Sequence, residues 1–469
     1  MPNALSEGIS YEKTAFAGIS IDYRRFNSDS MLDNFKMERD EIRKYDPSTP
    51  ITTNLMGTYR YLDYFKWAKE MDIISWDSYP AYNTPWSLTA MRHDLMRGLK
   101  KAPFMLMEQT PSQQNWQPYN SLKKPGQMRA QSYQTIAHGA NTIQFFQLRR
   151  SIGGCEKFHG AVIAHSGSKE TRVFKEVQSL GKELAEIGTN ILNTKNKSEV
   201  CLLFDWDNYW ALEYTSGPNK DLKYIEQIHY IYEYFYSKNI SVDLISTEDD
   251  LSNYKLVLAP ALYMVKEGVD QRIEAYVKNG GTFVTGYMSG IVDQSDNVHL
   301  GGYPGPLREL TGIWVEEIDA LAPEQSNGIK FKNGHSGNGI LLSDIIHLEG
   351  ARPIAYFSSN FYENMPAATV NQYGKGRVYY LGTQFDRVSL ANILEEVTNH
   401  AKVIQDFSSY ELEITRRYAE DKTVTFIINL TEQTHSLPKE FIGQTDILSS
   451  SVLKKEKQLA PNDVIIILE

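Results

Sequence analysis

The chain has 469 residues, of which 41% are hydrophobic and 23% are charged, and its formal net charge is −10 at pH 7. This length allows about two to four domains, and the apolar content is sufficient for buried cores. The acidic balance and the lack of a basic stripe argue against nucleic-acid and anionic-membrane partners.

The two cysteines, Cys155 and Cys201, are too few for a disulfide framework or a cysteine-rich zinc site. The first residues lack the basic and apolar regions of a signal peptide, and no stretch approaches the roughly 18 apolar residues of a membrane span. The sequence therefore predicts a cytoplasmic protein.

Residues 28–190 alternate between predicted helices and predicted strands. The strands are short and continuously apolar, as expected for a parallel sheet that is buried on both faces. We expect them at residues 51–56, 73–77, 104–107 and 142–146. The first helix is expected to begin at Ser28 or Ser30 and to end at the Asp46-Pro47 break, and the others span 61–69, 89–98, 126–138 and 169–191.

Each predicted strand ends on a polar residue: Asn54, Asp77, Glu108 and Gln147. A (β/α)8 barrel carries its chemistry at this edge of the sheet, where the carboxyl ends of the parallel strands meet. Only four strand-helix units are recognisable before residue 190, whereas a complete barrel has eight.

A second α/β region is predicted from about 196 to 395. Its strands (200–205, 241–245, 255–260 and 281–286) alternate with helices (221–237 and 268–279), which favours a doubly wound sheet. Its glycines lack the spaced triad of a dinucleotide site, so no nucleotide cofactor is expected. Gly374-Lys375-Gly376 predicts a hairpin turn, and the short alternating runs after 402 predict a small antiparallel β domain.

Glu108 is the sharpest chemical feature of the sequence. It ends a strand whose preceding residues are all apolar, where a carboxylate is unfavourable unless it is hydrogen-bonded, paired or catalytic. The alternative is a strand-end glutamate that pairs with a nearby arginine.

Five other residues are candidates for binding a substrate. Trp116 lies in a polar loop, where an aromatic ring can stack on a sugar or simply pack. Glu156 and His159 are three residues apart and can bind sugar hydroxyls; the alternatives are a metal pair, for which no third ligand is evident, and surface charge. Tyr79 and Asp77 follow another strand end, although Asp77 can instead cap the next turn.

At these residues the sequence resembles the β-galactosidases of glycoside hydrolase family 42. The matching stretches are residues 21–26, 53–57, 74–80, 107–109, 115–120 and 154–160, and residues 204–207 with the α/β region that follows. The resemblance implies a retaining hydrolase that removes terminal β-D-galactose from oligosaccharides. It also implies Glu108 as the nucleophile, contacts from Trp116, Glu156, His159 and Tyr79 to the galactose, and no metal or cofactor in this chain.

The resemblance further implies three domains. Residues 1–192 would form the C-terminal half of a TIM barrel, with Glu108 on the seventh strand. Residues 196–398 would form a glutamine-amidotransferase-like α/β domain that assembles a homotrimer, and residues 402–469 a small antiparallel β domain.

The second catalytic carboxylate is the main departure from the family pattern. In the family the acid/base is the glutamate of an Asn-Glu pair on the fourth strand, and this chain has no Asn-Glu dipeptide. A half barrel would expose strand edges and an apolar face, so we expect low solubility or a separate N-terminal half-barrel polypeptide as partner. The alternative is a catalytically inactive, truncated homologue that retains assembly or weak sugar binding. A hydrolase acting through Cys201 is a third hypothesis.

Overall fold

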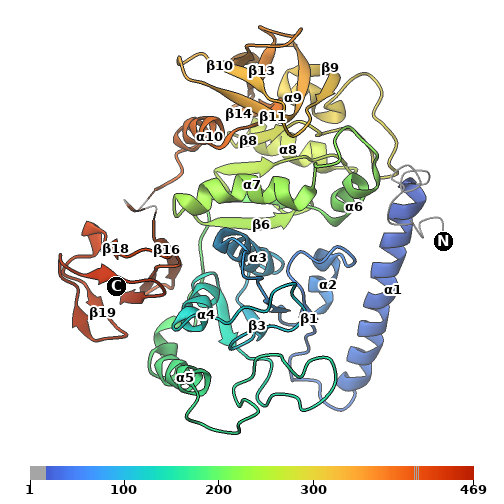
Figure 1. The fold of residues 1–469 in the computed structure, drawn as a ribbon. Coiled ribbons are helices and arrows are strands. Elements are labelled where there is room, and N and C mark those ends of the chain that lie inside the picture. The colour runs from blue at the N-terminus through green and yellow to red at the C-terminus, as the bar shows by residue number, and fades with distance from the viewer. Residues whose placement is uncertain (1–16, 406, 408, 410) are drawn as a thin grey trace.

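A computed structural model describes residues 17–469 of the chain, except 406, 408 and 410. The described residues form three units, each built around one main sheet, which we call N-terminal (17–196), middle (197–405) and C-terminal (407–469) (Figure 1). Within this range, no helix combines the length and the apolar character that crossing a membrane requires.

The N-terminal unit contains a four-stranded parallel sheet in the order β1-β2-β3-β4. Its elements are α1 (Ala17–Arg43), β1 (Asn54–Leu55), α2 (Tyr64–Glu70), β2 (Ser75–Asp77), α3 (Trp86–Gly98), β3 (Phe104–Glu108), α4 (Gln127–Ala137), β4 (Ala140–Ile143) and α5 (Arg172–Ile191). The strands follow chain order because each is joined to the next by a helical connection. The predicted alternation of strands and helices is therefore confirmed.

The first helix differs from its prediction. Helix α1 already includes Ala17, the first described residue, whereas a serine cap was expected at Ser28 or Ser30. Ser28 is buried within the helix, and its hydroxyl accepts a hydrogen bond from the backbone N–H of Asp63 at 2.9 Å. The serine thus accepts a hydrogen bond from another segment instead of capping its own helix. A sequence pattern cannot distinguish these two roles.

The middle unit has an eleven-stranded sheet. Its first four strands along the chain are parallel, as predicted, and most of the later strands are antiparallel. Strands β5 (Val200–Phe204), β6 (Val242–Ser246), β7 (Leu256–Ala259) and β8 (Thr282–Gly286) are parallel. Helices accompany them: α6 (Trp206–Tyr214), α7 (Tyr224–Ser237), α8 (Val269–Lys278) and α10 (Arg387–Ala401).

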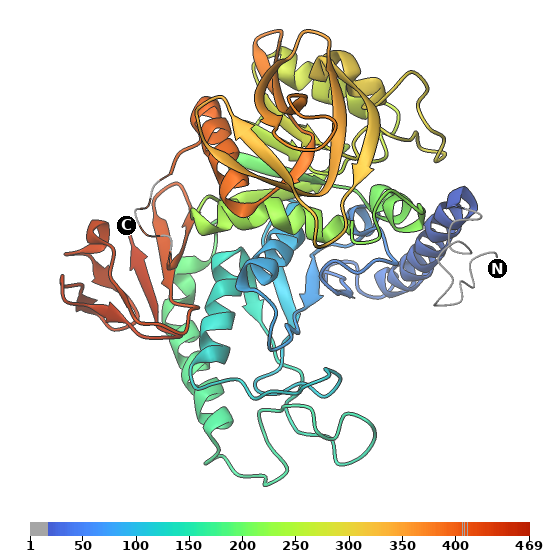
Figure 2. The same ribbon diagram turned by 45° about the horizontal axis from the view of Figure 1, so that its top comes forward.

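Antiparallel strands extend this sheet on the side away from the N-terminal unit (Figure 2). They are β9 (Ile313–Ala320), β10 (Asn327–Phe331), β11 (Ser336–Leu348), β12 (Arg352–Phe357), β13 (Pro366–Tyr373) and β15 (Thr383–Phe385), preceded by the one-turn helix α9 (Arg308–Thr311). Strand β14 (Gly376–Leu381) joins both parts, because it is parallel to β8 and antiparallel to β13. Gly374 and Lys375 form the predicted turn of the β13–β14 hairpin.

The C-terminal unit is an antiparallel β structure. Its sheet has the order β16-β17-β22-β19-β20, and β18 pairs with β21. The strands are β16 (Glu413–Tyr418), β17 (Thr423–Ile428), β18 (His435–Ser436), β19 (Thr445–Asp446), β20 (Ser451–Val452), β21 (Gln458–Leu459) and β22 (Val464–Leu468). Phe426 and Ile466 of this sheet share a buried cluster with Met128 and Tyr133 of α4.

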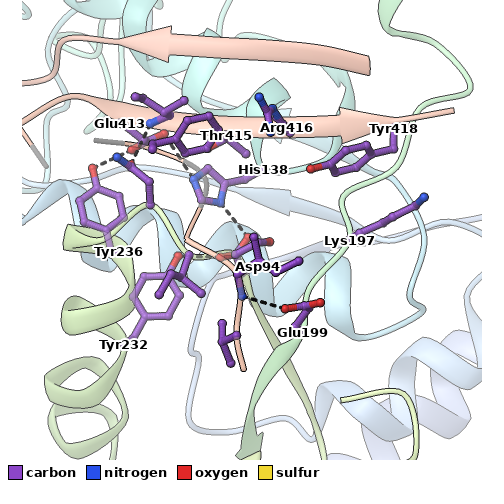
Figure 3. Close-up of a pocket in the computed structure, with 17 residues that line it drawn as sticks. Asp94, His138, Lys197, Glu199, Tyr232, Tyr236, Glu413, Thr415, Arg416 and Tyr418 are labelled. Carbon is purple, nitrogen blue, oxygen red and sulfur yellow. Dashed lines mark hydrogen bonds and ion pairs between the residues drawn. The ribbon is translucent and has the colours of Figure 1, made fainter. Parts of the chain in front are cut away.

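A buried ionic cluster joins the three units where they meet (Figure 3). The imidazole of His138 lies between two carboxylates, 2.7 Å from Asp94 of α3 and 3.3 Å from Glu413 of β16. From helix α7, the hydroxyl of Tyr232 donates to Asp94 and that of Tyr236 donates to Glu413, each at 2.6 Å. One connected set of side chains therefore links all three units.

Arg417, also on β16, forms a second connection to the N-terminal unit. Its guanidinium is fully buried and donates to the carbonyl oxygens of Ile136, Ala140 and Thr194 and to the side chain of Asn141, at 2.7–2.9 Å. Burial, followed by the charge of Arg97, lowers the pKa of Arg417 to about 10. The acceptors are neutral, so carbonyl dipoles rather than a carboxylate hold this cation.

Candidate active site

The polar residues at the strand ends lie close together. The side-chain amide of Asn54, on β1, donates to Asp77 at 2.6 Å and to Glu108 at 3.5 Å. Asp77 and Glu108 are register partners on adjacent strands β2 and β3. The predicted meeting of strand-end side chains at the carboxyl edge of a parallel sheet is thus observed for three of the four residues named.

Glu108 is held by contacts from the segment that follows β2. Its backbone carbonyl accepts from the N–H of Ser78 at 2.9 Å, and its Oε2 accepts from the hydroxyl of Tyr79 at 2.8 Å. Burial, together with the hydrogen bond to Glu108, raises the pKa of Tyr79, so the phenol remains a donor. The carboxylate is fixed at one oxygen and partly exposed.

Asp77 has a different protonation behaviour from an ordinary aspartate. Burial raises its pKa to about 7, with a further contribution from the charge of Glu108, and the hydrogen bond from Asn54 opposes the rise. Because two adjacent negative charges repel each other, the neighbouring carboxylate of Glu108 favours the protonated form of Asp77. The site therefore contains one carboxyl group that gains or loses a proton near neutral pH.

An aromatic wall stands beside the carboxylates. The ring of Trp116 is 49% exposed and lies 5.5 Å from the ring of Tyr79 and 4.8 Å from that of His159, between centroids. Phe146, which follows β4, contacts His159 from another side at 5.3 Å. Trp116 thus presents an open face that is backed by packed rings, an arrangement suited to stacking on a sugar.

His159 lies beneath this wall and is fully buried. Its Nδ1 lies 3.1 Å from the amide oxygen of Asn115, and its Nε2 has no hydrogen-bond partner among the described residues. Burial lowers the pKa of the imidazole, although the charge of Glu156 opposes this. The neutral ring supports Trp116 and Tyr79, and its direct contact with a sugar stays a prediction.

Gly160 allows the loop that carries Glu156 and His159 to approach the loop after β3. Its N–H donates to the carbonyl of Gln113 at 2.8 Å, and a Cβ at this position would lie 2.5 Å from the Thr110 hydroxyl oxygen. Any larger residue would push the two loops apart. The amide of Gln113 also donates to the carbonyl of Phe158 at 3.0 Å, so the loops are joined at several points.

Glu156 lies at the edge of the same loop and is partly exposed. Its backbone carbonyl accepts from the N–H of His159 at 2.9 Å, so the two residues close one turn, as their spacing suggested. Among the residues that the structure describes, no three His, Cys, Asp or Glu side chains are arranged to hold a metal ion. The role of Glu156 in binding a sugar stays a prediction.

Sequence reasoning did not single out two residues that shape this site. Asn115 holds the Nδ1 side of His159, and its place next to Trp116 was the available signal. Phe146 lies at the end of β4 among other apolar residues, so no sequence signal separated it from the core.

Two other regions could be mistaken for the active site. Cys201 is fully buried on β5, and burial raises the pKa of its thiol, so it is inert as a nucleophile. The cluster of Asp94, His138 and Glu413 lines a cavity of about 320 Å³, but His138 precedes β4, at the strand end opposite Glu108. That end of a barrel-type sheet serves stability rather than chemistry.

Comparison with known proteins gives consistent matches over the whole chain. A family model described as "Beta-galactosidase", that of glycoside hydrolase family 42, matches residues 1–187, and one described as "Beta-galactosidase trimerisation domain" matches residues 198–404. The β-galactosidase BgaP of Planococcus sp. (strain L4) is 51% identical over 99% of this chain and 70% of its own length. The β-galactosidase LacZ of Lactobacillus acidophilus is 50% identical over 97% of this chain and 69% of its own.

Solved structures agree with these relatives. A crystal structure of the β-galactosidase from Bacillus circulans sp. alkalophilus superposes with a TM-score of 0.94 at 47% identity, covering 97% of this chain and 68% of that chain. The β-galactosidase of Rahnella sp. R3 gives a TM-score of 0.91 at 38% identity.

Proposed function

The chain belongs to the β-galactosidases of glycoside hydrolase family 42, and on that premise we propose that it carries the nucleophile, Glu108, of a retaining β-galactosidase. The observation that supports this most directly is the hydrogen bond from Tyr79 to one oxygen of Glu108, beside the open face of Trp116. The substrate is a β-galactoside with its terminal galactose stacked on Trp116, and Glu156 and His159 contribute contacts from below.

The reaction proceeds in two displacements. One oxygen of Glu108 forms a bond to the anomeric carbon while the glycosidic bond breaks, and the departing oxygen takes a proton from an acid. Water then attacks the anomeric carbon, gives its proton to the same group acting as a base, and releases Glu108. Net retention follows because the anomeric carbon is inverted twice.

The acid/base requires a second carboxyl group about 5–5.5 Å from the nucleophile, on the other side of the glycosidic bond. Asp77 does not meet this requirement, because it is the register partner of Glu108 and shares Asn54 with it, so both belong to one wall of the site. We propose that the acid/base comes from four further strands that complete the barrel. These lie in a longer form of the same polypeptide or in a separate N-terminal half-barrel polypeptide.

Two features of the N-terminal unit support this completion. Within the described residues, β1 and β4 each pair on one side only, so the sheet has two open edges. Helix α1 lies at the edge of the molecule (Figure 1), where Arg25 pairs with Asp207 of α6, and Phe26, Met31 and Met37 on it are more than half exposed. Exposed apolar side chains and two free strand edges match what the C-terminal half of a TIM barrel presents to its other half.

The remaining parts of the proposal concern assembly. We propose a homotrimer formed through the middle unit, because that unit matches a model described as a trimerisation domain. We also propose that the domain limits are 1–192, 196–398 and 402–469, and that the protein acts in the cytoplasm. The alternative function is a catalytically inactive homologue that retains only assembly or weak sugar binding.

A covalent labelling experiment tests the nucleophile without requiring the acid. A 2-deoxy-2-fluoro-β-galactoside with a dinitrophenolate leaving group needs no protonation to depart, and the fluorine slows release of the intermediate. We expect mass spectrometry to find the fluorogalactosyl group on the peptide that contains Glu108. Labelling is to be measured for the chain alone and after mixing with a polypeptide that carries the first four strands of a family barrel.

The controls separate the two functions. Glu108→Gln abolishes labelling if Glu108 is the nucleophile, whereas Glu170→Gln, on the exposed loop before α5, leaves it unchanged. Labelling at another residue would refute the assignment. No labelling of either preparation would favour the inactive alternative, and hydrolysis of nitrophenyl β-galactoside only by the mixture would support completion of the barrel.

A further inference from the structure

A second cavity lies beside the Glu108 site. Its volume is about 360 Å³, and it is enclosed by the loop after β2, the loop after β3 and the first turns of α3 and α4. Pro80 and Gln117 line it and directly follow Tyr79 and Trp116 of the first site. The same two loops therefore line both the Glu108 site and this second cavity. The volume of the second cavity is within the range of small-ligand sites.

Buried polar side chains in this cavity have unused hydrogen-bonding capacity. Gln131 is 8% exposed, and its side-chain amide makes no hydrogen bond to any residue that the structure describes. Lys123 is 7% exposed, and the one hydrogen bond of its Nζ to a described residue goes to the carbonyl of Thr110, at 2.6 Å. Both residues line the cavity, so a ligand bound there can supply the partners that they lack.

The chemistry of the wall favours a neutral ligand rich in hydroxyl groups. Most of its polar residues are amides or hydroxyls, which both donate and accept, as sugar hydroxyls do: Ser112, Gln114, Gln117, Asn120, Gln127 and Gln131. Burial lowers the pKa of Lys123 to about 7, so its amine carries only part of a charge near neutral pH. Glu432 and Lys124 at the rim form an ion pair, so together they add little net charge to the wall.

Two exposed tyrosines form the rim of the cavity. Tyr82 and Tyr119 come from different loops, are 63% and 68% exposed, and lie with their ring centroids 5.8 Å apart. Exposed aromatic rings next to a polar cavity offer faces for the C–H groups of a sugar, while the amides behind them bind its hydroxyls.

We propose that this cavity is a second saccharide-binding site, which holds a neutral oligosaccharide beside the galactosyl site. The inference rests on the proposed function only in the choice of galactosides as probes. The C-terminal unit takes part, because Lys124 on the loop after β3 forms an ion pair with Glu432 at 2.6 Å. Docking of that unit therefore fixes one wall of the site.

The test uses the full chain with Glu108→Ala and Trp116→Ala, so that the galactosyl site cannot bind. Lactose and a longer galacto-oligosaccharide are titrated by isothermal calorimetry. We expect both to bind, with the longer sugar tighter, and we expect Tyr119→Ala or Tyr82→Ala to raise the Kd at least tenfold. Tyr45→Ala, which removes an 89% exposed tyrosine just after α1, is the matched control and should leave the Kd unchanged.

A second variant protects the test against local unfolding. Gln131→Leu keeps the volume of the buried side chain and should weaken sugar binding while the thermal unfolding midpoint stays within a few degrees. Loss of all binding in the Glu108→Ala/Trp116→Ala background would overturn the proposal, as would a Kd indifferent to Tyr82 and Tyr119. Competition by inorganic phosphate would instead identify an anion site at Lys123. Because Glu108 is absent from every variant, these outcomes do not depend on whether it is the nucleophile.

Discussion

The hydroxyl of Tyr79 donates a hydrogen bond to Oε2 of Glu108 at 2.8 Å and thereby joins the ends of two neighbouring strands. The contact fixes one carboxylate oxygen and leaves the other available to attack a substrate. Asn54 reaches the same carboxylate from the other direction at 3.5 Å. The orientation of Glu108 thus depends on residues from three strand ends.

Replacing Tyr79 with phenylalanine should slow attack by Glu108 without unfolding the chain. A hydrogen bond to a charged group contributes about 1.5–3 kcal/mol, which corresponds to a rate change of roughly tenfold or more. The rate of fluorogalactosyl labelling of Glu108 measures this effect. Tyr45→Phe, at an 89% exposed tyrosine outside both sites, is the control, and an unchanged rate in Tyr79→Phe would show that the contact does not orient the nucleophile.

Asp77→Asn should stabilise the protein near neutral and alkaline pH and not in acid. The folded-state pKa of Asp77, about 7, exceeds the value of about 4 for an unfolded aspartate. Between about pH 4 and pH 7 the folded state therefore binds more protons than the unfolded state. The stability associated with Asp77 is therefore fully present below about pH 4 and is lost as the pH rises through 7.

The asparagine removes the carboxyl that titrates while its amide oxygen still accepts from Asn54. We expect a gain of about 1–2 kcal/mol at about pH 8, reduced from the full linkage value because the side chain is partly solvated. Thermal unfolding of both proteins between about pH 4 and pH 8 gives the difference. Parallel curves for the two proteins would contradict the raised pKa.

The wild-type protein should lose stability at alkaline pH because of His138, at the junction of the three units. His138→Gln should remove this loss. Burial alone would lower the pKa of His138, but Asp94 and Glu413 raise it to about 9, above the unfolded value of about 6.5. The contribution of the imidazolium is therefore fully present below pH 6.5 and is lost as the pH rises through 9. By linkage it amounts to about 3 kcal/mol at most.

Thermal unfolding midpoints between about pH 6 and pH 10 distinguish the two proteins. The wild-type midpoint should fall across this range, and that of His138→Gln should be lower at pH 6 and flatter. The exposed residue His165 offers a matched control, since His165→Gln should preserve the wild-type curve. A steep wild-type decline that persists in His138→Gln would assign it to another group.

Arg417→Met should loosen the C-terminal unit from the N-terminal unit. The change removes four hydrogen bonds donated by a buried cation and leaves the carbonyl oxygens of Ile136, Ala140 and Thr194 without this donor. We expect a loss of at least about 3 kcal/mol of unfolding free energy. Arg417→Lys should recover only part, because one ammonium cannot span the same acceptors.

Urea unfolding gives the change in free energy, and limited proteolysis shows whether the C-terminal unit separates first. Lys454→Met, at an exposed position of the same unit, is the control for loss of a positive charge. Equal stability of Arg417→Met and the wild type would mean that apolar packing between Phe426 and α4 is sufficient for docking.

Much of the fold could be predicted because its local patterns are strong. The apolar runs that predicted strands at 104–107 and 200–205 correspond to β3 and β5. Strand β5 is buried at every position, as expected for a sheet covered on both faces, whereas buried and partly buried residues alternate along most of β3. The start of α1 could not be placed, because Ser28 serves Asp63 of another segment. The antiparallel strands β9–β12 were not predicted. Strands β10 and β11 form a hairpin, but β9 pairs with β11 and β10 pairs with β12, and such non-consecutive pairings are not encoded by a local period.

The sequence by itself determined which residues end the strands, and so which can meet at one edge: Asn54, Asp77 and Glu108 follow directly from strand position and parallel order. Only the tertiary structure decided that His159 lies beneath Trp116, that Asp94, His138 and Glu413 form one cluster, and that Gln134 reaches Glu413 from 279 residues away. The spacing of apolar residues along a segment indicates which of its sides is buried and which faces water. Contacts between distant segments depend on how the three units pack, and no local pattern encodes that arrangement.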